Sequence, residues 1–257
     1  MSQEWRVDDK GNRIHSTAVV GQDVVLGHRN SVGPLSVVGG LGCSVILGDD
    51  NSIGVGSVIG SPPESATGYS WSTHLNFEEW ARQNSEVVKG VIIGSKCVIR
   101  DKVTIHAGML KSTSIADLNY IHSSCHVDHD VSSQVGTVLA PLVAIGGEVS
   151  LGAFCQIGMG ACLHQGSSIG ALTMIGMNST VKGHVRPMSL LYGSPARYHG
   201  INLIRLNRLG LDDATLLRAS KYSAGELSNE SEVTECNALI ATLVSQSLAE
   251  ALHAWTA

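Results

Sequence analysis

Large aliphatic residues recur at every sixth position along most of this chain. The longest run comprises Leu139, Ile145, Leu151, Ile157, Leu163, Ile169, Ile175 and Val181. A small residue stands four positions after each aliphatic, for example Cys155 after Leu151 and Ala161 after Ile157. A period of six is neither the period of two of a simple strand nor the 3.6 of a helix. It predicts a short strand and a corner, with the aliphatic and the small residue both facing inward.

Three such units, eighteen residues, would close one triangular coil, and stacked coils would pair their strands about 4.8 Å apart. The sequence therefore predicts a parallel β-helix of hexapeptide repeats. The same frame runs through residues 14–59, with one shift, and resumes from 93 to 181, with a second shift between Ile105 and Ile115. The period does not determine handedness, although the general rule for parallel crossovers favours a right-handed coil.

The frame divides the chain into two expected parts, a β-helix domain over residues 1–200 and a helical domain over 201–257. An insertion at about 61–90, which contains Trp71 and Trp80, leaves the frame, and residues 108–112 form a second, shorter loop. The insertion would either line a site or cover a coil edge. In the second part, Asp212 is a predicted helix cap and Asn229 to Glu232 a capping box. We expect these helices to close the open end of the β-helix.

Composition excludes several classes of function. The net charge of −5 offers no basic surface for nucleic acid. The chain contains no run of eighteen apolar residues, so we expect no membrane span. Its charged start lacks the apolar centre of a signal peptide. Six cysteines without a CxxC pair suggest free thiols in the reducing cytoplasm. Cys97, Cys125 and Cys155 take the small inward position and are predicted packing residues.

Ionisable residues crowd into the stretch CHVDHDV at residues 125–131. Counting coils from Leu163 back to Ile105 places His106, His129 and His164 with Glu148 along one corner, facing outward. An imidazole beside a carboxylate, such as His129 beside Asp130, suits general base chemistry near pH 7. Solvated surface histidines are the alternative.

A metal site is a competing interpretation of this histidine line. His129 and His164 are expected two coils apart, with Cα atoms roughly 10 Å apart. That separation is long for one ion with bonds of about 2 Å, unless a second subunit supplies a ligand. We assign no metal ligands from the sequence.

At these residues the chain resembles the bacterial acyl-ACP:UDP-N-acetylglucosamine O-acyltransferase family of lipid A synthesis. The resemblance rests on VIRDKVTIHAG (98–108), CHVDHDV, GGEVSLGAF (146–154), CLHQGSSIG (162–170), GSPARYHGIN (193–202) and RLNRLGL (205–211). It implies a left-handed parallel β-helix with a C-terminal helical domain, a homotrimer with active sites between subunits, and no cofactor. An acyl-ACP or acyl-CoA thioester would be the co-substrate.

The same resemblance implies roles for individual residues. His129 would be the general base, Asp130 would orient it, and the Gly147 amide would supply the oxyanion hole. The implied substrate-binding residues are His106, His126, Glu148, His164, Gln165, Met177, Asn202 and Arg208. Of these, Asn202 and Arg208 would contact the nucleotide, although Arg208 could equally form a surface salt bridge.

The chain departs from the family pattern in several ways: the family's Asp-Leu-Lys loop is not visible in 61–90, and Leu209 stands in place of the second Arg of a terminal pair. Three further features bear on the substrates. Glu148 replaces a histidine of the family's sugar pocket, which would favour an amino group on the acceptor. Met177 occupies the position that sets acyl length, and predicts an acyl group shorter than fourteen carbons unless it only packs between coils. From residue 222 onward the chain carries glutamates but no Lys or Arg, a surface that would repel an acidic carrier protein. The donor would then be acyl-CoA, or the carrier protein would dock elsewhere.

The predicted function is therefore acyl transfer from a thioester to UDP-N-acetylglucosamine or a related UDP-sugar. Three alternatives remain: N-acylation of a nucleotide-linked amino sugar, a zinc hydratase of the γ-carbonic anhydrase type, and a non-catalytic scaffold.

Overall fold

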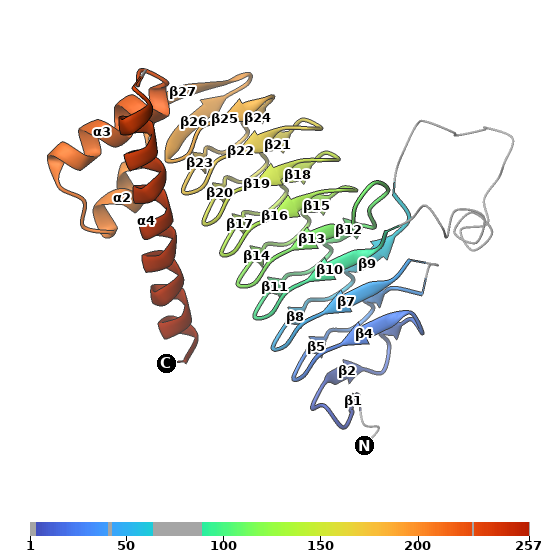
Figure 1. The fold of residues 1–257 in the computed structure, drawn as a ribbon. Helices are drawn as coiled ribbons and strands as arrows, with labels where there is room; N and C mark the ends of the chain where they lie inside the picture. The colour runs from blue at the N-terminus through green and yellow to red at the C-terminus, as the bar shows by residue number, and fades with distance from the viewer. Residues whose placement is uncertain (1–3, 41–42, 64–88, 228, 257) are drawn as a thin grey trace, which may run out of the picture.

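A computed structural model describes residues 4–40, 43–63, 89–227 and 229–256. The chain winds into a parallel β-solenoid whose coils stack from the N-terminal end to β26, with three helices beside its C-terminal half (Figure 1). Each side of the coil contributes its strands to one of three sheets, here called sheets A, B and C. The predicted β-solenoid with a C-terminal helical region is confirmed.

The strands are mostly two or three residues long. Sheet A contains β1 (Trp5–Val7), β2 (Arg13–His15), β5 (Ser31–Val32), β8 (Ser52–Ile53), β11 (Val98–Ile99), β14 (Tyr120–Ile121), β17 (Val138–Leu139), β20 (Gln156–Ile157), β23 (Met174–Ile175), β26 (Ser189–Gly193) and β27 (Ala196–Ile201). Sheet B contains β3 (Val19–Val20), β6 (Val37–Val38), β9 (Val58–Ser61), β12 (Thr104–His106), β15 (His126–Val127), β18 (Ala144–Ile145), β21 (Cys162–Leu163) and β24 (Thr180–Val181). Sheet C contains β4 (Val24–Leu26), β7 (Val45–Leu47), β10 (Val91–Ile93), β13 (Thr113–Ile115), β16 (Ser132–Ser133), β19 (Ser150–Leu151), β22 (Ser168–Ile169) and β25 (His184–Val185).

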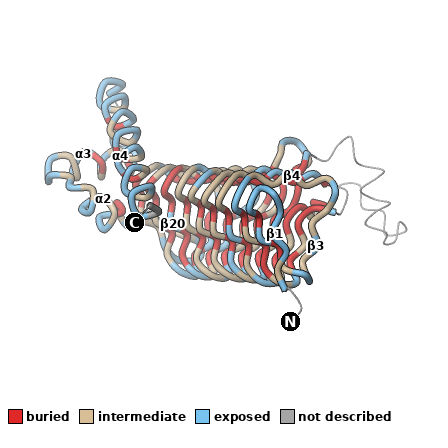
Figure 2. The backbone as a smooth tube through the Cα atoms, turned by 90° about the horizontal axis from the view of Figure 1, so that it is seen from below, coloured by how far each residue is buried: buried red, intermediate tan, exposed pale blue. Residues whose placement is uncertain are grey.

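The strand register follows the hexapeptide frame. Ile145 of β18 lies beside Val127 of β15 on one side and Leu163 of β21 on the other. Figure 2 shows the buried residues lining the inside of the stacked coils and the exposed residues at their corners. Because strands contribute both an aliphatic and a small residue to the interior, the core is one continuous aliphatic column.

The three cysteines predicted to pack in the core do so. Cys97 and Cys155 are fully buried and Cys125 is 1% exposed. Burial raises the pKa of the Cys97 and Cys155 thiols to about 12, since removal from water disfavours the thiolate. These thiols are therefore packing groups.

The coil corners have a backbone conformation that the aliphatic frame does not reveal. A residue with positive φ recurs every six positions, and many of these residues are not glycine. The run is Leu118, Ser124, Asp130, Gly136, Leu142, Glu148, Phe154, Gly160, Gly166, Leu172 and Asn178. A side chain in this left-handed region costs roughly 1 kcal/mol. The regular stacking of the coils therefore overrides the usual preference for glycine.

The C-terminal helices are α2 (Leu203–Arg208), α3 (Asp213–Ala224) and α4 (Glu230–Thr256). Asp212 caps α3 as predicted, and its carboxylate accepts the Thr215 N–H at 2.8 Å. Asn229 precedes α4 and accepts the Ser231 N–H at 2.9 Å.

The expectation that the helices close the open end of the solenoid is only partly correct. α3 contacts β27 at that end, whereas α4 runs back along the side of the coils (Figure 1). A second apolar cluster explains this position, because corner residues Phe154 and Leu172 pack with Leu206 of α2 and Leu243 of α4. The helices therefore pack on the side of the solenoid where large apolar residues occupy the corner after sheet C.

Two expectations concern other parts of the chain. Most of the predicted insertion, including Trp71 and Trp80, lies outside the described residues. Among the helices that are described, none combines the length and apolarity that a membrane crossing requires.

Candidate functional site

The candidate site lies at the corner that follows sheet B. β12, β15, β18 and β21 are consecutive in that sheet, so the residues just after their aliphatic positions stack coil upon coil. His106 thus lies beside Asp128, followed by Gly146 and His164 on the next two coils. His129, Gly147 and Gln165 occupy the adjacent position. The stacking predicted from the frame is confirmed.

His129 and Asp130 form a buried pair. His129 Nδ1 lies 2.8 Å from Asp130 Oδ2, and the two residues are 8% and 0% exposed. The other carboxylate oxygen of Asp130 accepts the N–H groups of Met109, Leu110 and Lys111 at 2.8–3.0 Å. One carboxylate therefore orients the imidazole and holds the 108–112 loop.

The ionised state of Asp130 is maintained by these contacts. Burial alone would raise the pKa of Asp130, but the N–H groups of Lys111, Leu110 and Met109 and the ring of His129 together lower it below its ordinary value of 3.8. A carboxylate that stays charged next to Nδ1 favours the Nδ1–H tautomer of His129. Nε2 of that tautomer carries the lone pair that a general base needs.

Gly147 lies directly against the His129 ring. A Cβ atom at Gly147 would come within 2.6 Å of His129 Cε1 and 2.7 Å of His129 Nε2. Only glycine allows this approach of imidazole to backbone. The Gly147 N–H donates no hydrogen bond to another described residue, so a donor stands beside the candidate base.

The prediction that His106, His129, Glu148 and His164 all face outward needs correction, because only Glu148 and His164 are exposed. His106 and His129 are buried, at 6% and 8% exposure, while Glu148 and His164 are exposed. Asp130 anchors the 108–112 loop at this corner, and Gly147 lets the His129 ring pack against the backbone. The hexapeptide frame predicted which residues share the corner, but it could not predict that the loop and the neighbouring backbone bury His106 and His129.

The exposed end of the site carries a hydrogen-bonded pair across two coils. Gln165 Nε2 donates to Glu148 Oε1 at 2.9 Å. His164 turns Nδ1 toward the carbonyl of Gln165 at 2.9 Å. These polar groups flank Gly147 and are accessible to a ligand.

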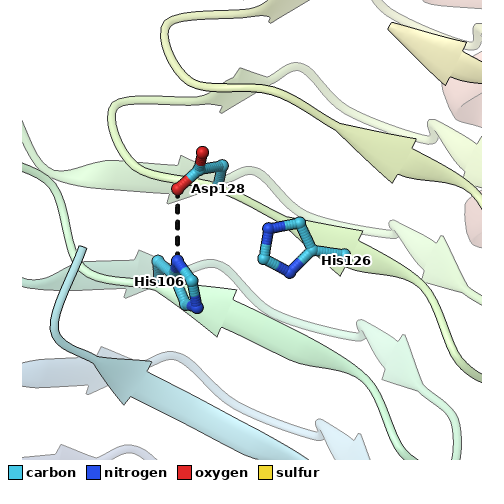
Figure 3. Close-up of side chains that lie close together, drawn as sticks. All are labelled: His106, His126 and Asp128. Atoms are coloured by element: carbon cyan, nitrogen blue, oxygen red, sulfur yellow. Dashed lines mark hydrogen bonds and ion pairs between the residues drawn. The ribbon is translucent and has the colours of Figure 1, made fainter. Parts of the chain in front are cut away.

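On the two coils that precede Gly147, the side chains of His106, His126 and Asp128 converge (Figure 3). His106 Nδ1 lies 3.1 Å from Asp128 Oδ1, and the rings of His106 and His126 meet edge to face at 4.8 Å. Potential metal-ligand atoms of the three residues all lie within 4.8 Å of one another. These are the described residues that could hold a metal ion.

Asp128 is the functional candidate that the sequence reasoning left out of the site. Its Oδ1 also accepts the His129 backbone N–H at 2.7 Å. Burial works to raise the pKa of Asp128, but hydrogen bonds from His106 and His129 outweigh it and lower that pKa. The signal was present in the frame, which places Asp128 one coil above His106.

Three predicted substrate residues lie away from this cluster. Met177 is 69% exposed at the corner before sheet B, which excludes its alternative interpretation as packing between coils. Asn202 is buried as the N-cap of α2, and its amide donates to the Leu172 carbonyl at 2.9 Å. Arg208 is exposed in the last turn of α2. Within one chain, these residues do not join the histidine site.

This chain is similar in sequence to curated acyltransferases. It is 32% identical over 136 residues to the acyl-[acyl-carrier-protein]–UDP-N-acetylglucosamine O-acyltransferase of Burkholderia orbicola, covering 51% of this chain and 52% of that protein. The corresponding protein of Sinorhizobium medicae is 29% identical over 134 residues. The chain thus matches about half the length of these curated relatives. No protein-family model matches the chain.

Structural comparison extends the likeness in fold. LpxA from Acinetobacter baumannii superposes with a TM-score of 0.64 at 20% identity, over 91% of this chain and 93% of that one. The UDP-N-acetylglucosamine acyltransferase from Campylobacter jejuni superposes with a TM-score of 0.63 at 23% identity, over 81% of this chain and 82% of that one. The resemblance to this acyltransferase family, inferred from the motifs, is confirmed.

Proposed function

We propose that this chain, related over half its length to acyl-[acyl-carrier-protein]–UDP-N-acetylglucosamine O-acyltransferases, transfers an acyl group from a thioester to a hydroxyl group of a UDP-sugar such as UDP-N-acetylglucosamine. One observation carries the proposal. His129 is joined through Nδ1 to the buried Asp130 at 2.8 Å, and its Nε2 edge lies against Gly147. A base, its orienting carboxylate and a backbone N–H donor therefore share one corner.

These groups suit the steps of acyl transfer. His129 Nε2 removes the acceptor proton as the sugar oxygen attacks the thioester carbonyl. The Gly147 N–H donates to the oxyanion of the tetrahedral intermediate. When the intermediate collapses, the C–S bond breaks and His129 returns the proton to the leaving thiolate. Asp130 keeps its charge throughout and stabilises the imidazolium.

The polar groups around the base would position the sugar. Glu148 and Gln165 form a hydrogen-bonded, exposed pair. His126 begins β15 and His164 follows β21, the two strands that pair with β18. Asn202 already caps α2 through its side chain. Its contact to a nucleotide, and that of Arg208, would therefore need a site completed by another subunit.

A homotrimer with sites between subunits is part of the proposal. Leu142, Met159 and Met177 are 60%, 45% and 69% exposed at the corner that leads into sheet B. Exposed apolar side chains along one edge are typical of an interaction or ligand surface. Met177 there would limit the acyl group to fewer than fourteen carbons. Both acyl-ACP and acyl-CoA remain candidate donors.

The test is to incubate the protein with acyl-CoA or acyl-ACP of graded chain length and UDP-sugars, and to read product mass. His129→Ala should lower kcat by about 10²–10⁴-fold, whereas the control His122→Ala, on a different corner, should not. Hydroxylamine distinguishes an ester product from the amide expected of N-acylation. Wild-type turnover by His129→Ala would contradict the proposal, and carbon dioxide hydration without acyl transfer would support the hydratase instead.

A further inference from the structure

His106, His126 and Asp128 form a compact group beside the proposed base, and none of the three takes a proton-transfer or oxyanion role in the proposed acyl transfer. His106 ends β12 and His126 begins β15, the neighbouring strand of sheet B, and Asp128 follows that strand. Because two adjacent coils supply the three side chains, the rigid register of the solenoid sets their spacing. Figure 3 shows the two rings and the carboxylate turned toward one shared space.

From this arrangement we infer a binding site for a divalent transition metal, zinc in preference, with His106, His126 and Asp128 as its three protein ligands. Ligand atoms around a tetrahedral zinc ion with bonds of about 2.0–2.1 Å stand about 3.3 Å apart. His106 Nδ1 and Asp128 Oδ1 already stand 3.1 Å apart. The ligand atoms of all three residues lie within 4.8 Å of one another, and a rotation of the half-buried His126 side chain would bring its nitrogen to bonding distance of the ion.

Hydrogen bonds from neighbouring groups orient the side chains of the proposed ligands. His126 Nδ1 lies 2.7 Å from Thr104 Oγ1. If the hydroxyl oxygen accepts Nδ1–H, the lone pair resides on Nε2, the nitrogen that faces His106 and Asp128 in Figure 3. Asp128 accepts the His129 N–H at 2.7 Å, which steadies the carboxylate. Partners of this kind orient the ligands of zinc sites and raise their affinity.

Charge and burial support the same conclusion. Asp128 adds a carboxylate oxygen to the two imidazoles, and nitrogen and oxygen donors of this kind are ligands that zinc accepts. His106 is only 6% exposed and has little freedom to turn away. Two imidazoles and one carboxylate leave a fourth position open, as in catalytic zinc sites. The ion would replace the proton shared by His106 and Asp128.

Metal binding can be measured on the protein alone, without substrate. Chelator-treated protein is titrated with Zn²⁺ by calorimetry and with Co²⁺ by visible absorbance, in a Cys162→Ser background that removes the exposed thiol. One equivalent of Zn²⁺ per chain should bind, and Co²⁺ should give the intense bands of a tetrahedral site. Asp128→Asn should weaken Zn²⁺ by about tenfold or more, and His126→Gln likewise.

His122→Gln and Asp101→Asn are matched controls, because both residues lie on a different corner of the same coils. The Asp128→Asn variant keeps an oxygen acceptor for the His129 N–H, and its circular dichroism and thermal midpoint verify the fold. The inference is overturned if no saturable single equivalent binds, or if Asp128→Asn binds zinc as tightly as the parent. Because no acyl donor is present, failure of acyl transfer leaves this result unaffected.

Discussion

The imidazole of His129 rests on the Cα atom of Gly147, close enough that a Cβ there would come within 2.7 Å of Nε2. The two residues come from adjacent coils, since Val127 pairs with Ile145. The register thus places a backbone N–H donor beside the nitrogen of the proposed base. The proposed acyl transfer depends on that contact.

A methyl group at Gly147 should therefore displace the His129 ring. We expect Gly147→Ala to lower kcat/KM by about 10²-fold, as misplacement by an ångström can. Gly166→Ala is the matched control: it lies one coil further at the same corner, and a Cβ there meets nothing within 4 Å. Its positive φ costs roughly 1 kcal/mol and should alter stability more than activity. Equal activity losses in the two variants would show that the His129 contact is unimportant.

Asp130 should make the free energy of unfolding fall as the pH becomes acidic. Its pKa is held below 3.8 in the folded chain, so its charged form stabilises the fold above its unfolded pKa, and this contribution is lost as pH falls through the folded pKa. We expect Asp130→Asn to cost about 1–3 kcal/mol at neutral pH and to flatten the decline of stability below about pH 4. Urea unfolding from neutral to acid pH measures both. Parallel curves for wild type and variant would contradict the assignment.

The inward and outward positions of the frame should differ sharply in their effect on stability. Ile145 is 1% exposed beneath the site, whereas Ile92 of β10 is 43% exposed. Ile145→Ala should destabilise the fold by about 2–5 kcal/mol through lost burial and a cavity. Ile92→Ala should cost less than about 1 kcal/mol. Chemical denaturation of the two variants makes the comparison, and similar costs would mean that the interior is not packed as described.

Met177 should affect substrate choice and leave the fold intact. Its side chain is 69% exposed, so Met177→Gly should change the unfolding free energy by about 1 kcal/mol or less. If it limits the acyl channel, the variant should accept longer acyl chains than the wild type. Met159→Gly, at the same position one coil earlier, is the control. An unchanged chain-length profile would remove Met177 from the acyl site.

Thiol chemistry offers a test of burial that needs no substrate. Cys162 is exposed, while the other five cysteines are buried, and burial raises the pKa of Cys97 and Cys155 to about 12. A thiol reagent at mildly alkaline pH should thus modify about one cysteine rapidly in the native protein. Cys162→Ser should abolish that fast phase. Several fast-reacting thiols in the variant would indicate a looser core.

The sequence by itself determined the solenoid, because most inward positions hold aliphatic or small residues, and these positions repeat with the coil. The same six-residue period predicted that His106 lies beside Asp128 and His129 beside Gly147. In a parallel solenoid, residues one coil apart in sequence are neighbours in space. It also identified Asp212 as a helix cap, a local interaction between neighbours in sequence.

Only the tertiary structure decided which of these side chains are buried and which hydrogen bonds they make. The burial of Asp130 depends on three N–H groups from the 108–112 loop, which breaks the frame and whose course no period predicts. The flank position of α4 depends on Phe154 and Leu172 at left-handed corners. Side-chain orientation and solvent access arise from contacts between segments far apart in the chain, and a one-dimensional pattern contains neither.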